Sequence, residues 1–154
     1  MSKRSTILEH LRETLFPGIT TTAGYNNTLN TIERGQRSRS SLGDTDFPAL
    51  FIVTTKEKRK NITGNQFQAT LQVALLLYVK DTKSDPNSDG TGVQKDLDLI
   101  IEDVTKKLEA DRLQGGRVHW TEITDIDTDD GDLLPYAGAV IGVEFEYTTE
   151  GVSP

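Results

Sequence analysis

The 154-residue sequence contains no cysteine, which excludes disulfides and thiol chemistry. It has only two histidines, so a histidine-based catalytic or metal site would have to use His10 or His119. Long apolar runs are also missing: the longest, residues 73–79, is far too short to span a bilayer. The first residues are polar and show no apolar signal segment. These absences predict a cytosolic chain without a membrane span.

The distribution of charge is more informative than its total. The net charge is −7, which disfavours tight binding of DNA or RNA. Residues 1–60 carry 10 Lys and Arg against 6 Asp and Glu, whereas residues 61–154 carry 7 against 18. Oppositely charged halves suit head-to-tail association of like subunits, although a solvated mixed surface explains them about equally well.

The N-terminal part of the sequence predicts one helix and a polar stretch. Residues 6–16 place Ile7, Leu8, Leu11 and Leu15 on one stripe. Thr6 and Glu9 have the spacing of a capping box, and Pro17-Gly18 ends the pattern. A short strand is expected near residues 29–34. Residues 35–46 have almost nothing to bury and are expected to form a mobile loop with a small basic cluster.

Strand patterns dominate the middle of the chain. Residues 47–53 are apolar on both faces, which indicates an internal strand, and a basic turn is expected at residues 56–61. Residues 67–80 then alternate strictly, with apolar side chains on one face. The other face becomes apolar toward the end of this strand, at Ala74, Leu76 and Tyr78. We expect this apolar end to be covered, and a neighbouring subunit is one candidate for the cover.

The C-terminal half predicts a long helix and two more strands. Residues 93–113 have an apolar helical stripe that Gly115-Gly116 ends. Strands are expected near residues 117–126 and over 137–147, with an acidic loop between them and a frayed tail at 151–154. We therefore predict a single α+β domain over residues 1–154. Its mainly antiparallel sheet of four to five strands has both helices packed on one face.

The sequence shows no catalytic constellation. His10 is expected on the polar side of the first helix, exposed to solvent, and His119 is expected on the sheet surface without a histidine companion. No serine occupies a nucleophile-elbow pattern, and no phosphate-binding glycine loop is present. We therefore predict a protein that is not an enzyme and has no cofactor.

One segment matches the spacing of a calcium loop. Asp85, Asn87 and Asp89 alternate before Gly90, and Asp96 takes the twelfth position. A strand is expected before this segment instead of a helix, and its twelfth residue is aspartate instead of glutamate. An ordinary polar loop is therefore favoured over a metal site.

Two groups of basic residues are candidates for contacts with phosphate or with an acidic protein surface, such as that of another subunit. They come from the polar stretch and from the expected turn, and they are Arg34, Arg37, Arg39, Lys56, Lys58, Arg59 and Lys60. No aromatic residues lie among them, so a base-stacking platform is not expected. Salt bridges at subunit contacts are favoured slightly over solvated loops.

The layout as a whole resembles the tail-terminator, or tail-completion, proteins of long-tailed bacteriophages. The resemblance covers nearly the full chain and depends on order, not on an invariant motif. It includes the N-terminal amphipathic helix, the strand Phe47-Pro48-Ala49-Leu50-Phe51-Ile52, the alternating strand from Phe67 to Lys80, the helix from Val93, Gly115-Gly116, and the final strand through Phe145-Glu146-Tyr147.

The resemblance implies a virion protein of the tail–neck region, assembled in the host cytoplasm. It implies a homohexameric ring that caps the tail tube and ends its polymerisation, with the seven basic residues named above as candidate contacts with a subunit or the tube. The ring would dock a head-side connector or stopper protein, and genomic DNA would pass through its lumen without specific binding. Another head–tail connector or minor tail protein is the alternative, and a calcium-binding interaction module is a weaker one.

Overall fold

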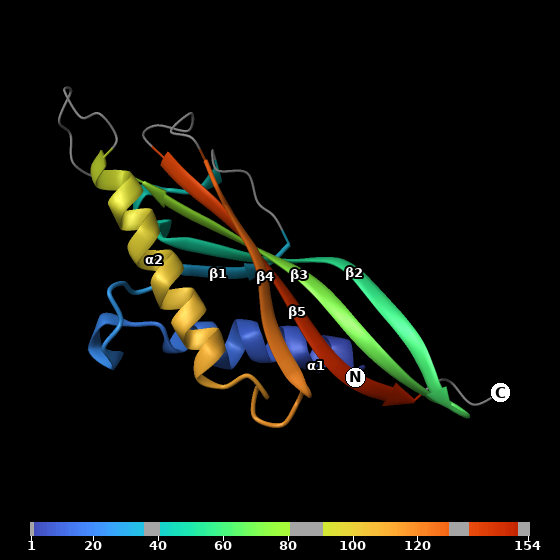
Figure 1. Ribbon diagram of the computed structural model, residues 1–154. Coiled ribbons are helices and arrows are strands. Elements are labelled where there is room, and N and C mark those ends of the chain that lie inside the picture. The colour runs from blue at the N-terminus through green and yellow to red at the C-terminus, as the bar shows by residue number, and fades with distance from the viewer. Residues whose placement is uncertain (1, 36–40, 81–90, 130–135, 151–154) are drawn as a thin grey trace.

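The computed structural model describes residues 2–35, 41–80, 91–129 and 136–150. They form a five-stranded sheet with two helices (Figure 1). The strand order is β1-β2-β3-β5-β4, with β1 parallel to β2 and every other pair antiparallel. The elements are α1 (Lys3–His10), β1 (Thr31–Arg34), β2 (Ala49–Thr63), β3 (Gln66–Lys80), α2 (Thr91–Ala110), β4 (Trp120–Thr128) and β5 (Tyr136–Glu150). The predicted α+β class and mainly antiparallel sheet are confirmed.

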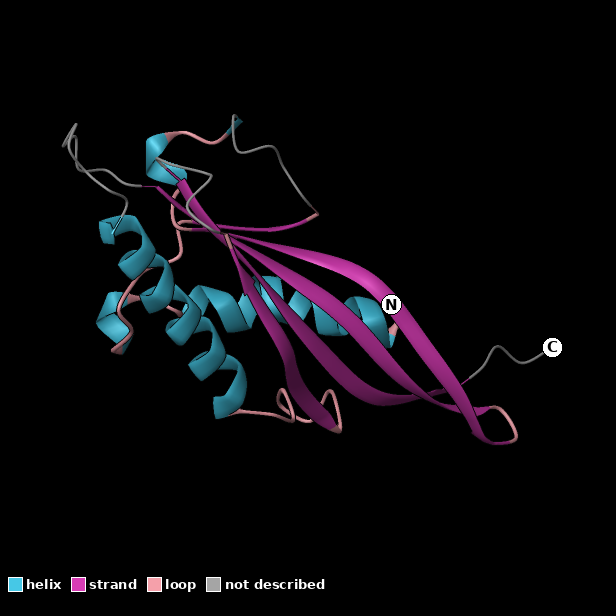
Figure 2. Cartoon of the chain, turned by 45° about the horizontal axis from the view of Figure 1, so that its top comes forward, coloured by secondary structure: helices cyan, strands magenta, loops and turns pink. Residues whose placement is uncertain are grey.

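Both helices cover the same side of the sheet, which we call the front face (Figure 2). The period-two patterns of β3 and β5 bury alternate side chains there, and α2 adds its apolar stripe. The largest fully buried side chains of this core include Phe16, Leu71, Leu75, Leu97 and Phe145. The predicted inward faces of both strands are therefore confirmed, except that Phe67 is only partly buried.

The opposite side, the back face, carries a smaller apolar cluster. Its buried members are Leu42, Phe47, Ala49 and Phe51, and they pack against Leu76, Tyr78 and Tyr136. The segment between β1 and β2 thus covers the apolar end of β3 from within the same chain. One expectation was wrong here: Leu42 is buried, although its segment was expected to bury almost nothing. The expected cover over Leu76 and Tyr78 is present and comes from the same chain, which leaves both side chains partly buried. The remainder of the predicted mobile loop, residues 36–40, lies outside the described residues.

Helix α1 begins earlier than its apolar stripe predicts. Ser2 has extended backbone angles, and its Oγ accepts a hydrogen bond from the backbone amide of Ser5 at 3.1 Å, as an N-cap does. The predicted capping box is wrong, since Thr6 Oγ1 donates to the Ser2 carbonyl at 3.0 Å and lies inside the helix. The helical path continues through residues 11–18 and buries Leu11, Leu15 and Phe16.

The predicted basic turn at residues 56–61 is wrong. These residues continue β2 for its full length to Thr63, and the chain reverses at Gly64, whose φ of 52° favours glycine. The β2–β3 hairpin therefore extends beyond both helices (Figure 1). A register shift between Thr54 and Lys56 divides β2 into two parts. The first part lies over the core, and the second is exposed on most of its surface.

A buried carboxylate fastens the loop before β1 onto α2. The side chain of Asp103 accepts hydrogen bonds from the backbone amides of Asn26 and Asn27, each at 2.9 Å, and from Asn27 Nδ2 at 3.3 Å. Asp103 is only 2% exposed, so these bonds replace the water that a carboxylate would otherwise bind. Two lysines of the same helix, Lys106 and Lys107, lie about 5.5 Å from the centre of the Tyr25 ring. Together, the hydrogen bonds to Asp103 and the lysine contacts with Tyr25 hold residues 20–30 against α2.

Candidate assembly surface

Three exposed lysines share the back face of β2. Strand pairing places Lys56 opposite Gln72, Lys58 opposite Thr70 and Lys60 opposite Gln68. These β3 partners alternate with the residues that fill the front-face core, so the three lysines extend from the back face. The bulge after Thr54 sets this alternation. The lysines predicted as contact residues therefore form one basic row along a strand, not a turn.

The same face is acidic on the far side of the sheet. Glu144 and Glu146 of β5 accept hydrogen bonds from the side-chain amides of Gln72 and Gln68. Beyond them, on β4, pairing places Glu122 opposite Glu144, Asp125 opposite Gly142 and Asp127 opposite Val140. The back face thus changes from basic at β2, through neutral amides and hydroxyls at β3, to acidic at β5 and β4.

Arg59 belongs to the front face instead. Its Nε donates to Glu57 at 2.9 Å, and the hydroxyl of Tyr147 donates to the same carboxylate. Burial, together with this hydrogen bond, raises the pKa of Tyr147. Although burial opposes the change, the hydrogen bonds from Tyr147 and Arg59 lower the pKa of Glu57. These three side chains fasten β2 to β5 and separate Arg59 from the lysine row.

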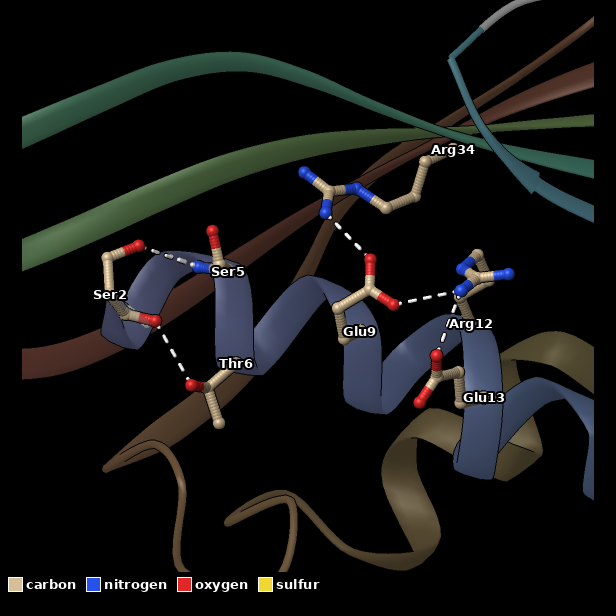
Figure 3. A network of polar contacts seen from close by, with 7 residues as sticks. All are labelled: Ser2, Ser5, Thr6, Glu9, Arg12, Glu13 and Arg34. Atoms are coloured by element: carbon tan, nitrogen blue, oxygen red, sulfur yellow. Dashed lines mark hydrogen bonds and ion pairs between the residues drawn. The ribbon is translucent and has the colours of Figure 1, made fainter.

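Arg34, at the end of β1, forms an ion pair within the chain (Figure 3). Its Nη1 lies 2.8 Å from Glu9 Oε1, while Arg12 Nη2 lies 3.0 Å from the other carboxylate oxygen. The hydrogen bonds from Arg34 and then Arg12 lower the pKa of Glu9 to about 2. An open groove of about 700 Å³ lies between this pair and the edge of β2. Arg34 therefore joins α1 to β1, and Arg37 and Arg39 lie outside the described residues.

The calcium-loop candidate remains a prediction. Asp85, Asn87 and Asp89 lie outside the described residues, and Asp96 is exposed near the start of α2. Across residues 2–35, 41–80, 91–129 and 136–150, no three His, Asp or Glu side chains are grouped closely enough to hold a metal ion. No helix of the described chain is long and apolar enough to cross a membrane.

The two histidines occupy different environments. His119 is exposed and its Nε2 lies 2.7 Å from Thr148 Oγ1, as expected for a sheet-surface residue. His10 was expected in solvent, but its Nδ1 is buried beside Gln114, which is itself 1% exposed. Burial and the charge of Arg117 lower the pKa of His10. This environment disfavours the charged imidazolium.

Comparison with known protein families identifies the family of this chain. A family model described as "Bacteriophage Tail Tube Terminator Protein" matches residues 1–153. The chain belongs to this family. The curated proteins contain no match to the sequence. The terminator is thus a tail component of a phage virion, and its family is structural, not enzymatic.

The terminator has one surface feature that sequence reasoning missed. Trp120, at the start of β4, is 46% exposed, and the guanidinium of Arg112 lies 4.8 Å from its ring centre. Arg112 also donates to the Thr121 carbonyl at 2.9 Å and lies 3.7 Å from Glu122. An exposed tryptophan paired with arginine is typical of protein contact surfaces. The single tryptophan of the sequence is the one signal that could have indicated this surface feature.

Proposed function

We propose that this terminator forms a closed homohexameric ring on the end of the finished tail tube. The ring prevents further tube subunits from adding, and its other face docks the head-side connector or stopper protein. The protein acts through binding alone and is not an enzyme. The observation that carries the proposal is the charge gradient of the back face, from Lys56, Lys58 and Lys60 to Asp125 and Asp127.

This gradient suits a ring because each subunit of a ring offers two different surfaces to its neighbours. Such a heterologous interface closes when the rotation between subunits divides a full turn. A molecule with a basic row on one side and an acidic row on the other satisfies this requirement with a single chain. The net charge of −7 also agrees with genomic DNA passing through the lumen without specific binding.

The test is tube assembly with purified components. The phage's tube protein is polymerised alone and with increasing amounts of the terminator, and tube lengths are measured by negative-stain electron microscopy. We expect amounts well below those of the tube protein to stop growth and to leave a ring at one tube end. An unchanged length distribution, with no density at the tube ends, contradicts the proposal. A stopper-like connector would bind terminated tails and leave tube length unchanged.

A further inference from the structure

The sheet has two strand edges without a partner in the described part of the chain. On one side, β1 pairs with β2 only as far as Ile52, where Gly35 adds a last hydrogen bond of 2.9 Å. From Val53 to Thr63, the outer edge of β2 has no neighbouring strand among the residues that the structure describes. On the other side, the nine-residue β4 ends the sheet, and residues 124–128 are all exposed. Unpaired edges of this length readily accept another strand.

The directions of the strands make the two edges compatible. Strand β3 is antiparallel to β2, β5 is antiparallel to β3, and β4 is antiparallel to β5. Strand β4 therefore runs opposite to β2. When a second copy is placed beside the first with its back face on the same side, its β2 meets the first copy's β4 in antiparallel orientation. The sheet then continues across the boundary with its regular hydrogen bonding.

The charges on the two edges match in this arrangement. Antiparallel pairing with Lys58 opposite Asp125 also places Lys56 opposite Asp127, since back-face side chains recur every two residues. The bulge between Ile123 and Asp125 then brings Glu122 toward Lys60. No ion pair within the described residues engages these lysines or Asp125 and Asp127, and they stay exposed. Opposite charges directly across a strand pair stabilise it.

The acidic side carries a repulsion between carboxylates that such a neighbour would relieve further. Glu122 and Glu144 are directly opposed on adjacent strands, and like charges in this position are unfavourable. Within the chain, Gln72 donates to Glu144, and Trp120 donates to Glu122 at 2.7 Å, while Arg112 lies 3.7 Å away. A row of lysines from another copy would add positive charge where the carboxylates are most concentrated.

We infer that copies of this terminator join edge to edge, with β2 of one copy, from Val53 to Thr63, adding to β4 of the next. The partner is a second copy of the same chain, and the sheet is continuous around the assembly. This inference rests on the proposed ring and specifies which surfaces close it. Lysines on an edge strand can also serve only to prevent strand pairing, so the experiment must separate the two roles.

The experiment reverses charges on each edge and then on both. One variant is Lys56→Glu with Lys58→Glu, the second is Asp125→Lys with Asp127→Lys, and the third combines all four changes. The control, Lys95→Glu, reverses an exposed charge on α2, away from both edges. Assembly is measured by sedimentation velocity and native mass spectrometry, alone and with tube protein. Thermal unfolding of each variant at low protein concentration establishes that it is folded.

We expect each edge variant to raise the concentration needed for assembly at least about tenfold. The combined variant should recover most of the loss, and the control should assemble like the wild type. Rings that persist in both edge variants, or failure of the combined variant to recover, would overturn edge-to-edge pairing and leave the proposed ring intact. A wild-type protein that stays monomeric even with tube protein would overturn the proposed function as well.

Hydrogen exchange gives a second measurement that requires no variant. On assembly, amides on the outer edge of β2 should exchange more slowly at alternate positions between Val53 and Thr63. Amides of α2 should be unchanged and serve as the internal reference. Equal exchange along β2 in the monomer and in the ring would overturn the inference.

Discussion

The contact between Asp103 and the loop before β1 gives the sharpest prediction for the fold. We consider Asp103→Asn, which preserves the shape of the side chain and removes its charge. The carboxylate accepts three hydrogen bonds, two of them from backbone amides at 2.9 Å. A carboxamide has a single oxygen, so one of the two amides must face an NH₂ group instead of an acceptor. That amide is left without a partner at a position where water cannot easily replace the carboxylate.

The magnitude follows from the burial and the charge. A hydrogen bond to an ionised group contributes about 1.5–3 kcal/mol, and an unsatisfied buried donor costs a similar amount. We therefore expect Asp103→Asn to lower the free energy of unfolding by about 2–3 kcal/mol. For a chain of 154 residues, this corresponds to a Tm lower by roughly 4–12 °C. Calorimetry measures this change in Tm. All proteins are compared at the same concentration, because self-association makes Tm depend on protein concentration.

The control is Asp98→Asn, an equal chemical change on the exposed side of the same helix. Surface substitutions of this kind usually change stability by less than about 0.5 kcal/mol. The reasoning would be refuted if the two variants unfolded at the same temperature. In that case the carboxylate at Asp103 would not be what holds residues 20–30 on α2.

Replacing Arg34 with alanine should raise the pKa of Glu9 from about 2 toward its ordinary 4.5, as an NMR titration would show. Because folding lowers this pKa, the pair stabilises the fold above pH about 4.5, and its contribution is lost as the pH falls toward 2. Burial also lowers the pKa of His10. The free energy of unfolding should therefore decrease as the pH falls below about 6.5. Urea unfolding of His10→Gln at several pH values should show a smaller decrease. Phe51→Ala should lower the free energy of unfolding by about 3–5 kcal/mol, because Phe51 is fully buried. Ile62→Ala, at an exposed position, should lower it by less than about 0.5 kcal/mol. Equal losses in urea unfolding would mean that the back-face cluster is not a core.

The sequence predicts the fold well where a local pattern determines the structure. Strands β3 and β5 alternate over their whole length because one face is buried, and that alternation is visible without any other information. The apolar stripe of α2, from Val93 to Leu108, is equally easy to recognise in the sequence. These elements meet one another across the core, so their patterns together also predict the antiparallel sheet and the common side of the helices.

The candidate surface is less predictable because it depends on contacts between distant segments. Residues 56–61 read as a turn because a strand exposed on both faces carries no hydrophobic pattern. Their partners lie on β3, and only the bulge near Thr54 determines that the lysines share the back face. The contact of Arg112 with Trp120 and the burial of His10 beside Gln114 likewise join separate elements, which no spacing in the sequence reveals.

The structure also changes the physical reason for expecting assembly. The sequence suggested apolar surface awaiting a neighbour, but Leu42 and Phe47 already cover Leu76 and Tyr78. Within the described part of the chain, what remains without a partner is the hydrogen bonding of two strand edges and the opposite charges along them. Assembly by these interactions should weaken as salt shortens the screening length from about 10 Å at 0.1 M to about 3 Å at 1 M.

An interface held by apolar contact would show the opposite response, because concentrated salts such as sulfate favour burial of apolar surface. Sedimentation velocity in low and high salt, repeated with sodium chloride and sodium sulfate at equal ionic strength, separates the two cases. We expect the wild type to dissociate in both high-salt solutions. The combined variant, in which the charges of both edges are reversed, should dissociate in the same way. Rings that become tighter in sulfate would mean that apolar contacts, and not the charges of the lysine row, hold the subunits together.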